Sequence, residues 1–213
     1  MLVLDRLGKT YPNGVNALER FSAEIKLGEI VAIIGGSGCG KSTLLRAIAG
    51  LDRATSGTVT LDGTRIAAPH AKIGIIFQEP RLLPWLSVAD NIGFGLSDLS
   101  ANRRREKVAA ALAKVGLTDK ANAWPRELSG GQAQRVALAR GLVTGPEVLF
   151  ADEPTGSLDS VSGELVMDLL TDAAREHGTT VILVTHDARV AAYADREVVV
   201  RDGKVGTLTG SQP

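Results

Sequence analysis

The stretch "GGSGCGKST" (35–43) decides the fold of this 213-residue chain. It follows the apolar run "IVAII" (30–34) and leads into "TLLRAIAG" (43–50), which has the composition of a helix. Residues 35–42 satisfy the pattern G-x-x-x-x-G-K-[ST], and a strand before the loop with a helix after it makes the pattern credible as a phosphate site. The alternative is a glycine-rich turn that binds nothing; motif and context together favour the phosphate site.

Each group in this loop has a role in such a site. The glycines let backbone N–H groups close around phosphate oxygens, where a Cβ atom would obstruct the approach. The helix start adds unpaired N–H groups and the positive end of its dipole. We expect Lys41 to reach the β- and γ-phosphates and the Ser42 hydroxyl to ligate Mg²⁺. Cys39 is expected to be a spacer that bound nucleotide shields from thiol reagents. The predicted nucleotide-binding residues of the loop are Gly35, Gly36, Ser37, Gly38, Cys39, Gly40, Lys41, Ser42 and Thr43.

An acidic pair ends a second apolar run, in "VLFADEPTGSLD" (148–159). An acid at a strand end beside a phosphate loop holds Mg²⁺ directly or through water, which suits Asp152. Glu153 is then placed to polarise the attacking water as general base. The alternative is a solvated acidic loop, which is less favoured once the phosphate loop is taken into account.

Three further side chains are predicted at the same site. His186 in "ILVTHDA" (182–188) and Gln78 in "IIFQ" (75–78) end apolar runs, and ligands in parallel sheets bind beyond the carboxyl ends of the strands. We expect His186 to donate to the γ-phosphate and Gln78 to sense the metal or the water; a structural histidine is the alternative. Tyr11 in "KTYPNG" (9–14) is a candidate for stacking on adenine, against a core or surface role.

The composition limits the other possibilities. The 24 basic and 24 acidic residues balance, so no overall charge points to nucleic acid or an acidic membrane surface. The single cysteine rules out an internal disulfide and fits a reducing compartment. No run approaches the roughly 18 apolar residues that a membrane span needs, and the N-terminus does not resemble a signal peptide. We expect a soluble chain whose membrane role, if any, depends on a partner.

The spacing of apolar runs predicts an α/β fold with a mostly parallel sheet. Strands are expected at 29–35, 57–63, 72–77, 147–152, 179–186 and 196–203, and helices at 41–49, 103–115, 132–142, 161–176 and 188–194. The opening region is expected to form an antiparallel flank. Residues 87–142 contain no convincing strand and are predicted to form a helical subdomain within a core made of 1–86 and 143–213.

The order of these motifs resembles that of one family, the nucleotide-binding subunits of ABC transporters. The specific element is "LSGGQ" within "ELSGGQAQR" (127–135), because the two nucleotide motifs alone would admit any P-loop NTPase. The matches are Tyr11 to the adenine-stacking aromatic residue, Gly35–Thr43 to the Walker A loop, Gln78 to the Q-loop, Leu128–Gln132 to the signature, Val148–Glu153 to the Walker B strand, Ser157–Asp159 to the D-loop and His186 to the switch histidine.

The resemblance implies a P-loop NTPase with a RecA-like core, an antiparallel β flank and a helical subdomain that carries the signature. It implies ATP hydrolysis with Mg²⁺, in which Lys41, Gln78, Glu153 and His186 act in catalysis and Ser42, Gln78 and Asp152 serve the metal. It also implies a head-to-tail homodimer, in which Ser129, Gly130, Gly131 and Gln132 of one subunit meet the ATP of the other. A transmembrane permease is the expected partner and nucleic acid is not. The expected location is cytoplasmic, on the inner face of the cell membrane.

Two questions stay open at this point. "FQEPRLLPWLSVADNI" (77–92) resembles importer ATPases of the nitrate, sulfonate and taurine type, whereas "FADEPTGSLDS" (150–160) and "THDARVAAYADREVVVRDGKV" (185–205) resemble the lipoprotein-release and macrolide-efflux type. A natural outlier and a chimera joined near the signature helix both account for this. The alternative function is that of a soluble ABC ATPase in cluster assembly or linked to nucleic acid.

Overall fold

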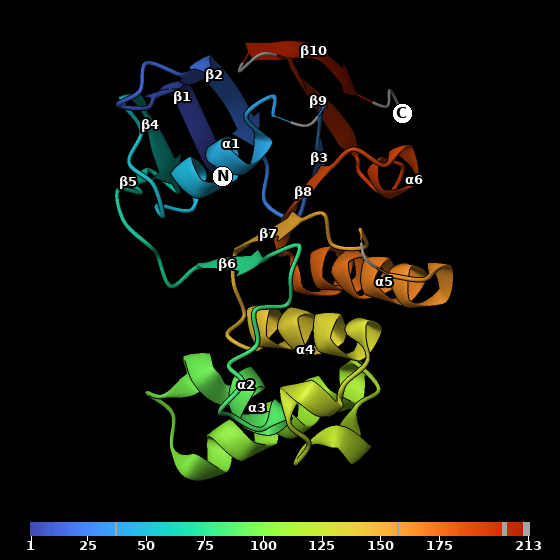
Figure 1. Cartoon of the computed structure of the whole chain (residues 1–213). Coiled ribbons are helices and arrows are strands. Elements are labelled where there is room, and N and C mark those ends of the chain that lie inside the picture. Colours follow the sequence, from blue (N-terminus) through green and yellow to red (C-terminus); the bar gives the residue numbers. More distant parts are fainter. Residues whose placement is uncertain (37, 157, 202–203, 211–213) are drawn as a thin grey trace.

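Two β-sheets occupy one end of the molecule and a group of helices occupies the other (Figure 1). The computed structural model describes residues 1–36, 38–156, 158–201 and 204–210. The first sheet has the order β2-β1-β4-β5 and is antiparallel. Its strands are β1 (Leu2–Thr10), β2 (Asn16–Ile25), β4 (Ser56–Leu61) and β5 (Thr64–Arg65). This is the expected antiparallel flank.

The second sheet has the order β10-β9-β3-β8-β7-β6 and is parallel except for the β9–β10 pair. Its strands are β3 (Ile30–Ile34), β6 (Ile73–Ile76), β7 (Val148–Asp152), β8 (Thr180–Thr185), β9 (Arg196–Arg201) and β10 (Lys204–Gly210). The central strands are apolar on successive residues because both faces of this sheet are covered. In β3, Val31 and Ile33 join one apolar cluster while Ile30 and Ala32 join the cluster on the opposite face.

Helices cover both faces of the parallel sheet. On one face, α1 (Lys41–Ile48) and the antiparallel sheet complete the first apolar cluster, through Leu44 and Leu45 among others. On the other face, α5 (Ser160–His177) contributes Val166 and Leu170 to the second cluster. The short helix α6 (Ala188–Ala191) adds Val190 to the same cluster.

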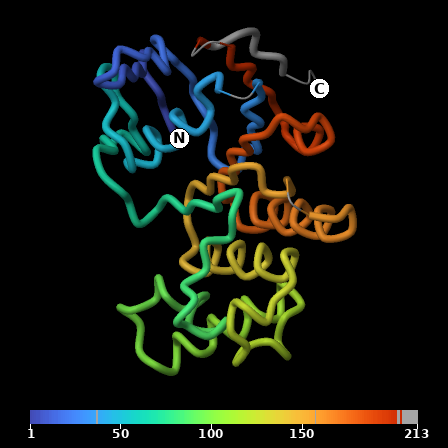
Figure 2. Tube along the Cα trace, viewed as in Figure 1, coloured from blue at the N-terminus to red at the C-terminus, as the bar shows by residue number. Residues whose placement is uncertain are grey.

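The helices between β6 and β7 form a third apolar cluster. They are α2 (Val88–Ile92), α3 (Ala101–Lys114), α4 (Gly130–Leu142) and the 3₁₀ turns Gly93–Leu96, Thr118–Lys120 and Pro125–Glu127. Figure 2 shows the chain leaving the sheet after β6, passing through these helices and returning into β7. Helix α4 packs on two sides: Leu138 belongs to the second cluster, whereas Val136 and Ala139 belong to the third. Residues 87–142, all of them described, contain no strand.

All five predicted helices differ from the structure by one to three residues at an end, and for two of them the hydrogen bonds show the reason. Helix α4 begins at Gly130 rather than Gln132, because Ser129 and Gln132 form a reciprocal capping box that draws both glycines into the first turn. Helix α6 ends at Ala191 rather than at residue 194, because the backbone N–H and the carboxylate of Asp195 both bond to the backbone of Ile30 in β3. Among the helices that the structure describes, none is long and apolar enough to span a membrane.

Candidate functional site

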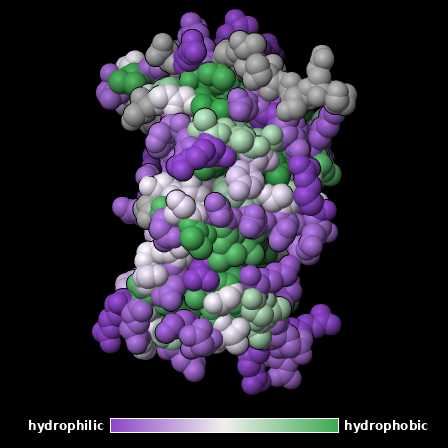
Figure 3. All heavy atoms as spheres, turned by 90° about the vertical axis from the view of Figure 1, so that its right-hand side faces the viewer, coloured by the Kyte–Doolittle hydropathy of each residue, from purple (hydrophilic) through white to green (hydrophobic). Residues whose placement is uncertain are grey.

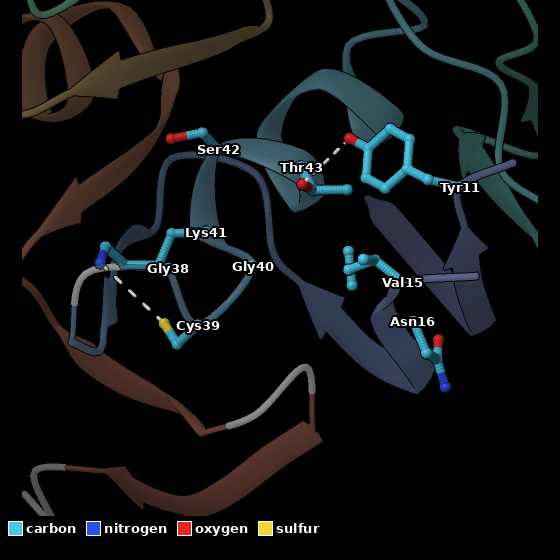
Figure 4. Close-up of a pocket in the computed structure, with 10 residues that line it drawn as sticks. Tyr11, Val15, Asn16, Gly38, Cys39, Gly40, Lys41, Ser42 and Thr43 are labelled. Carbon is cyan, nitrogen blue, oxygen red and sulfur yellow. Dashed lines mark hydrogen bonds between the residues drawn. The ribbon is translucent and has the colours of Figure 1, made fainter. Parts of the chain in front are cut away.

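The loop between β3 and α1 is shaped by glycine and closed by a lysine. Gly40 caps α1 with φ 104°, a conformation that favours glycine, and a Cβ atom there would strike the carbonyl oxygen of Ala17. The Lys41 ammonium donates to the carbonyl oxygens of Gly35, at 2.6 Å, and Gly36, at 2.9 Å. It also lies 4.0 Å from the Cys39 sulfur (Figure 4). Ser37, a predicted nucleotide-binding residue, lies outside the described residues.

A cavity of about 460 Å³ joins this loop to an aromatic ring. It is lined by Tyr11, Val15, Asn16, Ala17, Gly38, Cys39, Gly40, Lys41, Ser42 and Thr43. The Tyr11 hydroxyl lies 3.2 Å from the Thr43 hydroxyl, which holds the edge of the ring against α1 (Figure 4). The Lys9 ammonium lies 5.0 Å from the centroid of the ring. The volume falls within the range of ~300–1,000 Å³ that is usual for small-molecule sites. An aromatic face beside a phosphate-type loop has the layout that a nucleotide requires.

A second cavity, of about 530 Å³, collects the three residues predicted to serve a metal. Ser42 comes from the first turn of α1, Gln78 from the segment after β6, and Asp152 from the end of β7. Burial raises the pKa of the Asp152 carboxyl above its usual range, and the neighbouring Glu153 raises it further, while Ser42 and Lys41 act in the opposite direction. A hard cation would stabilise the ionised form of such a carboxylate, so these oxygen donors fit Mg²⁺.

Glu153 is held in place on both sides of its carboxylate. The Thr185 hydroxyl donates to Oε2 at 3.1 Å, and His186 Nδ1 lies 2.7 Å from Oε1. The register of β7 and β8 explains these contacts. Asp152 pairs with Val184, so Glu153, which follows Asp152, lies beside Thr185 and His186, which follow Val184. Glu153 has φ 45°, which costs a non-glycine residue about 1–3 kcal/mol. Its side chain is 14% exposed, against 71% for His186.

The signature residues lie at the start of α4, next to the start of α5. The Ser129 hydroxyl accepts from the Gln132 backbone N–H at 3.3 Å, and the Gln132 side-chain oxygen accepts from the Ser129 N–H at 2.9 Å. A Cβ atom on Gly131 would come within 2.7 Å of the Ser162 hydroxyl, so glycine allows the two helix starts to approach. Neither cavity at the phosphate loop is lined by Ser129, Gly130, Gly131 or Gln132 among the residues that the structure describes.

Asp159 caps α5. Its two carboxylate oxygens accept from the backbone N–H and the hydroxyl of Ser162, both at 2.9 Å, and these hydrogen bonds lower the pKa of the carboxyl. Asp159 also lines a third cavity, of about 320 Å³, together with Glu153 and His186. Ser162 therefore bonds to Asp159 of the predicted D-loop and also lies against Gly131 of the signature. Ser157 of the predicted D-loop lies outside the described residues.

Sequence reasoning missed three polar residues at the site. Thr185 precedes His186, and its position at the end of a buried strand was a signal that could have identified it. Gln134 and Arg140 extend from α4 to the backbone on either side of Gln78. No sequence pattern marked these two, because the contact depends on how the segment after β6 folds against the helix.

Comparisons with known proteins agree on one family. A family model described as "ABC transporter" matches residues 18–156. The chain is 52% identical over 198 residues to the "Aliphatic sulfonates import ATP-binding protein SsuB 1" of Xanthomonas axonopodis pv. citri, covering 92% of this chain and 79% of the relative. It is 47% identical over 197 residues to the SsuB protein of Cupriavidus necator, covering 91% of this chain and 64% of the relative.

Solved structures give the same result. A dimeric, post-hydrolysis structure of the ATP-binding cassette MJ0796, bound to ADP and Pi, superposes with a TM-score of 0.92 at 37% identity and full coverage of both chains. The cbiO1 protein of Clostridium perfringens, part of the ABC transporter complex cbiONQ, gives 0.89 at 34% identity, covering 98% of this chain and 88% of that one. The expected P-loop NTPase fold is confirmed. The chimera hypothesis gains no support, because a single relative aligns with 92% of the chain.

Proposed function

The chain belongs to the ABC transporter family and is an ATP-hydrolysing subunit, and we propose that it powers the import of aliphatic sulfonates through a separate membrane permease. The identity to two relatives named as aliphatic sulfonate import ATP-binding proteins, 52% and 47%, supports the substrate and the direction. On this proposal the chain works at the cytoplasmic face of the cell membrane, where ATP is supplied.

We propose that the first cavity holds ATP with its base on Tyr11 and its phosphates on the loop around Lys41. The ring of Tyr11 offers a flat apolar surface, fixed at its edge by the bond to Thr43. The Lys41 ammonium already bonds to two loop carbonyls, so it is held inside the phosphate loop. Phosphate oxygens would replace those carbonyls as its acceptors.

The observation that carries the catalytic proposal is the meeting of Ser42, Gln78 and Asp152 around one cavity next to that lysine. Residues from three separate elements supply a hydroxyl, an amide and a carboxylate there. Mg²⁺ commonly binds through one or two protein carboxylates together with substrate phosphates, and when bound here it would neutralise charge on the β- and γ-phosphate oxygens. Ser42 and Asp152 would hold it, with Gln78 beside it.

Glu153 is the proposed general base. Water attacks the γ-phosphorus as the bond to the β–γ bridging oxygen breaks, and the water proton passes to the Glu153 carboxylate, which leaves ADP and inorganic phosphate. Thr185 and His186 orient that carboxylate, so it does not have to be positioned during the reaction. Base catalysis of this kind typically contributes ~10²–10⁴-fold to the rate.

We also propose that two copies share their ATP sites in a head-to-tail dimer. Among the described residues, those at the start of α4 line neither cavity at the phosphate loop of their own copy, and the backbone N–H groups of a helix start are suited to bind phosphate. The side on which α5 and α6 project in Figure 1 faces the viewer in Figure 3, where an apolar area lies among hydrophilic residues. The exposed side chains of Val161 and Leu165 at the start of α5 are suited to pack against a second copy.

Uptake into sealed vesicles tests the transport function. The chain is reconstituted with the permease that co-purifies with it, ATP is enclosed on the side of the chain, and uptake of radiolabelled ethanesulfonate is followed. Uptake that depends on ATP and disappears in the matched Lys41→Ala preparation is the expected result. Export of the label, or uptake of sulfate in place of ethanesulfonate, would contradict the proposed direction or substrate.

A further inference from the structure

Side chains of α4 hold the backbone on both sides of Gln78. Gln134 donates through Nε2 to the carbonyl oxygen of Phe77 at 3.3 Å, one residue before Gln78. Arg140 donates through Nη2 to the carbonyl oxygen of Pro80 at 2.9 Å and through Nη1 to that of Arg81 at 3.0 Å. The segment that carries Gln78 is therefore fastened to α4 before and after the glutamine.

Arg140 is a half-buried cation whose partners are backbone carbonyls. Burial lowers the pKa of its guanidinium, and no carboxylate within the described ranges forms an ion pair with it. A guanidinium presents a planar set of donors that can bond to two acceptors at once. Its two bonds to Pro80 and Arg81 are thus the contacts that compensate the charge, and their loss would release the part of the segment that follows Gln78 from the guanidinium.

The segment itself is folded back and conformationally strained. Arg81 has φ 46°, a value that a non-glycine residue adopts only when its surroundings impose it. The carbonyl oxygen of Arg81 is one of the two acceptors of Arg140. The Arg81 guanidinium lies 4.3 Å from the centroid of the Phe77 ring, which closes the segment on itself around Gln78. Two kinds of contact therefore stabilise the strained turn. Arg140 bonds to its backbone from α4, and Arg81 packs on Phe77 within the turn itself.

Helix α4 links this turn to the signature. It begins next to Ser129 and packs against both the sheet and the helical subdomain. We propose that Arg140 is a positioning residue that fixes Gln78 relative to α4, so that a movement of this helix changes the distance of Gln78 from Ser42 and Asp152. The inference rests on the proposed role of Gln78 at the second cavity. On this proposal, Arg140 couples the position of the signature, at the start of α4, to the position of Gln78 at the second cavity.

A double-mutant cycle on the full chain tests this coupling. ATP hydrolysis is measured for the unaltered protein, Arg140→Met, Gln78→Ala and the double variant. Arg140→Met is expected to lower kcat about 10-fold while the KM for ATP stays within about twofold, because the cavity at Tyr11 and Lys41 is untouched. In the Gln78→Ala background, Arg140→Met is expected to lower kcat by less than about twofold, because the glutamine through which Arg140 acts is absent.

Arg135→Met is the matched control. Arg135 lies on the same helix but donates to the carbonyl oxygen of Val115 at 2.7 Å, beyond the end of α3. Its effect on kcat is expected to be the same with and without Gln78→Ala. Arg140→Lys, which retains the charge and can still reach one carbonyl, is expected to recover part of kcat; if Arg140→Met does not fold, the cycle is measured with Arg140→Lys. Hydrogen exchange of the amides at 77–82 is expected to speed up in the Arg140 variants and to stay unchanged in Arg135→Met.

Two results would overturn the inference. One is a loss of kcat from the Arg140 change that is equally large in the Gln78→Ala background; the other is unchanged exchange at 77–82. Absence of ATP hydrolysis in the unaltered, folded protein would contradict the proposed function instead, and an unchanged kcat in Gln78→Ala alone would contradict the role of Gln78. The failure of the inference and the failure of the function are thus distinguishable.

Discussion

Glu153 and His186 lie 33 residues apart in sequence, yet His186 Nδ1 approaches Glu153 Oε1 to 2.7 Å. They meet because β7 and β8 are parallel neighbours whose carboxyl ends lie at the same edge of the sheet. Thr185 adds a second bond to the same carboxylate. The proposed base and its exposed neighbour therefore already meet within one copy of the chain.

Glu153→Gln is expected to abolish turnover while ATP still binds. The amide retains the shape of the side chain but cannot accept the proton of the attacking water, so hydrolysis should fall by at least ~10²-fold. The ATP-bound dimer should then accumulate, which size-exclusion chromatography with ATP detects. Glu164→Gln, in the same cavity but on α5, is the matched control and should turn over as the unaltered chain does. A Glu153→Gln variant that remains monomeric in ATP would count against this account.

Lys41→Ala is expected to weaken nucleotide binding itself. A hydrogen bond from a charged group contributes about 1.5–3 kcal/mol, which corresponds to roughly 10- to 150-fold in Kd. Equilibrium titration with a fluorescent ATP analogue measures the change. Lys72→Ala serves as control, because Lys72 pairs with Glu147 and lines neither cavity at the phosphate loop. An unchanged Kd for Lys41→Ala would contradict the phosphate role.

Asp152→Asn is expected to stabilise the nucleotide-free chain and to impair hydrolysis. The pKa of Asp152 is raised in the folded state, so stability falls as the pH rises from the unfolded value of about 3.9 to the folded value, and the deficit persists at higher pH. The amide removes that deficit. Urea unfolding at pH 7 without Mg²⁺ should give a larger free energy of unfolding than the unaltered chain gives.

Asp159→Asn is expected to change stability in the opposite direction. The pKa of Asp159 is lowered by its bonds to Ser162, so its contribution is present above the unfolded pKa and is lost as the pH falls toward the folded one. The free energy of unfolding should therefore decrease at pH 7, and the difference from the unaltered chain should shrink below about pH 4. Equal shifts in the two aspartate variants would contradict these assignments.

The sequence predicted the parts of the fold that rest on burial. Strand β3 is apolar at every position, and β8 is apolar between its two terminal threonines, because both faces of the sheet are covered; that pattern is readable without a structure. The first two strands were predicted only as an antiparallel flank. Their pairing shifts register at several points between Leu4 and Thr10, which breaks the simple alternation that marks an exposed sheet.

Some residues of the candidate site could be predicted from the sequence and others could not. Gln78, Asp152 and His186 lie at or just after the carboxyl ends of parallel strands, so their convergence at one edge of the sheet follows from topology. Arg140 could not be predicted, because its acceptors are carbonyls of a strained turn and carry no side-chain signature. The roles assigned to these side chains, and the division of the chain at residues 86 and 142, stay predictions.

The shared site between two copies is the central claim, and mixing two inactive variants tests it most directly. A heterodimer of Lys41→Ala and Ser129→Arg contains one site with both an intact lysine and an intact signature, so hydrolysis should recover to the level of one site. A chain carrying both changes, paired with the unaltered chain, leaves no intact site and should form an inactive heterodimer. Hydrolysis by the first heterodimer and none by the second, each separated from its homodimers, is the result that this account predicts. Absence of recovery in a folded, dimeric first mixture would contradict it.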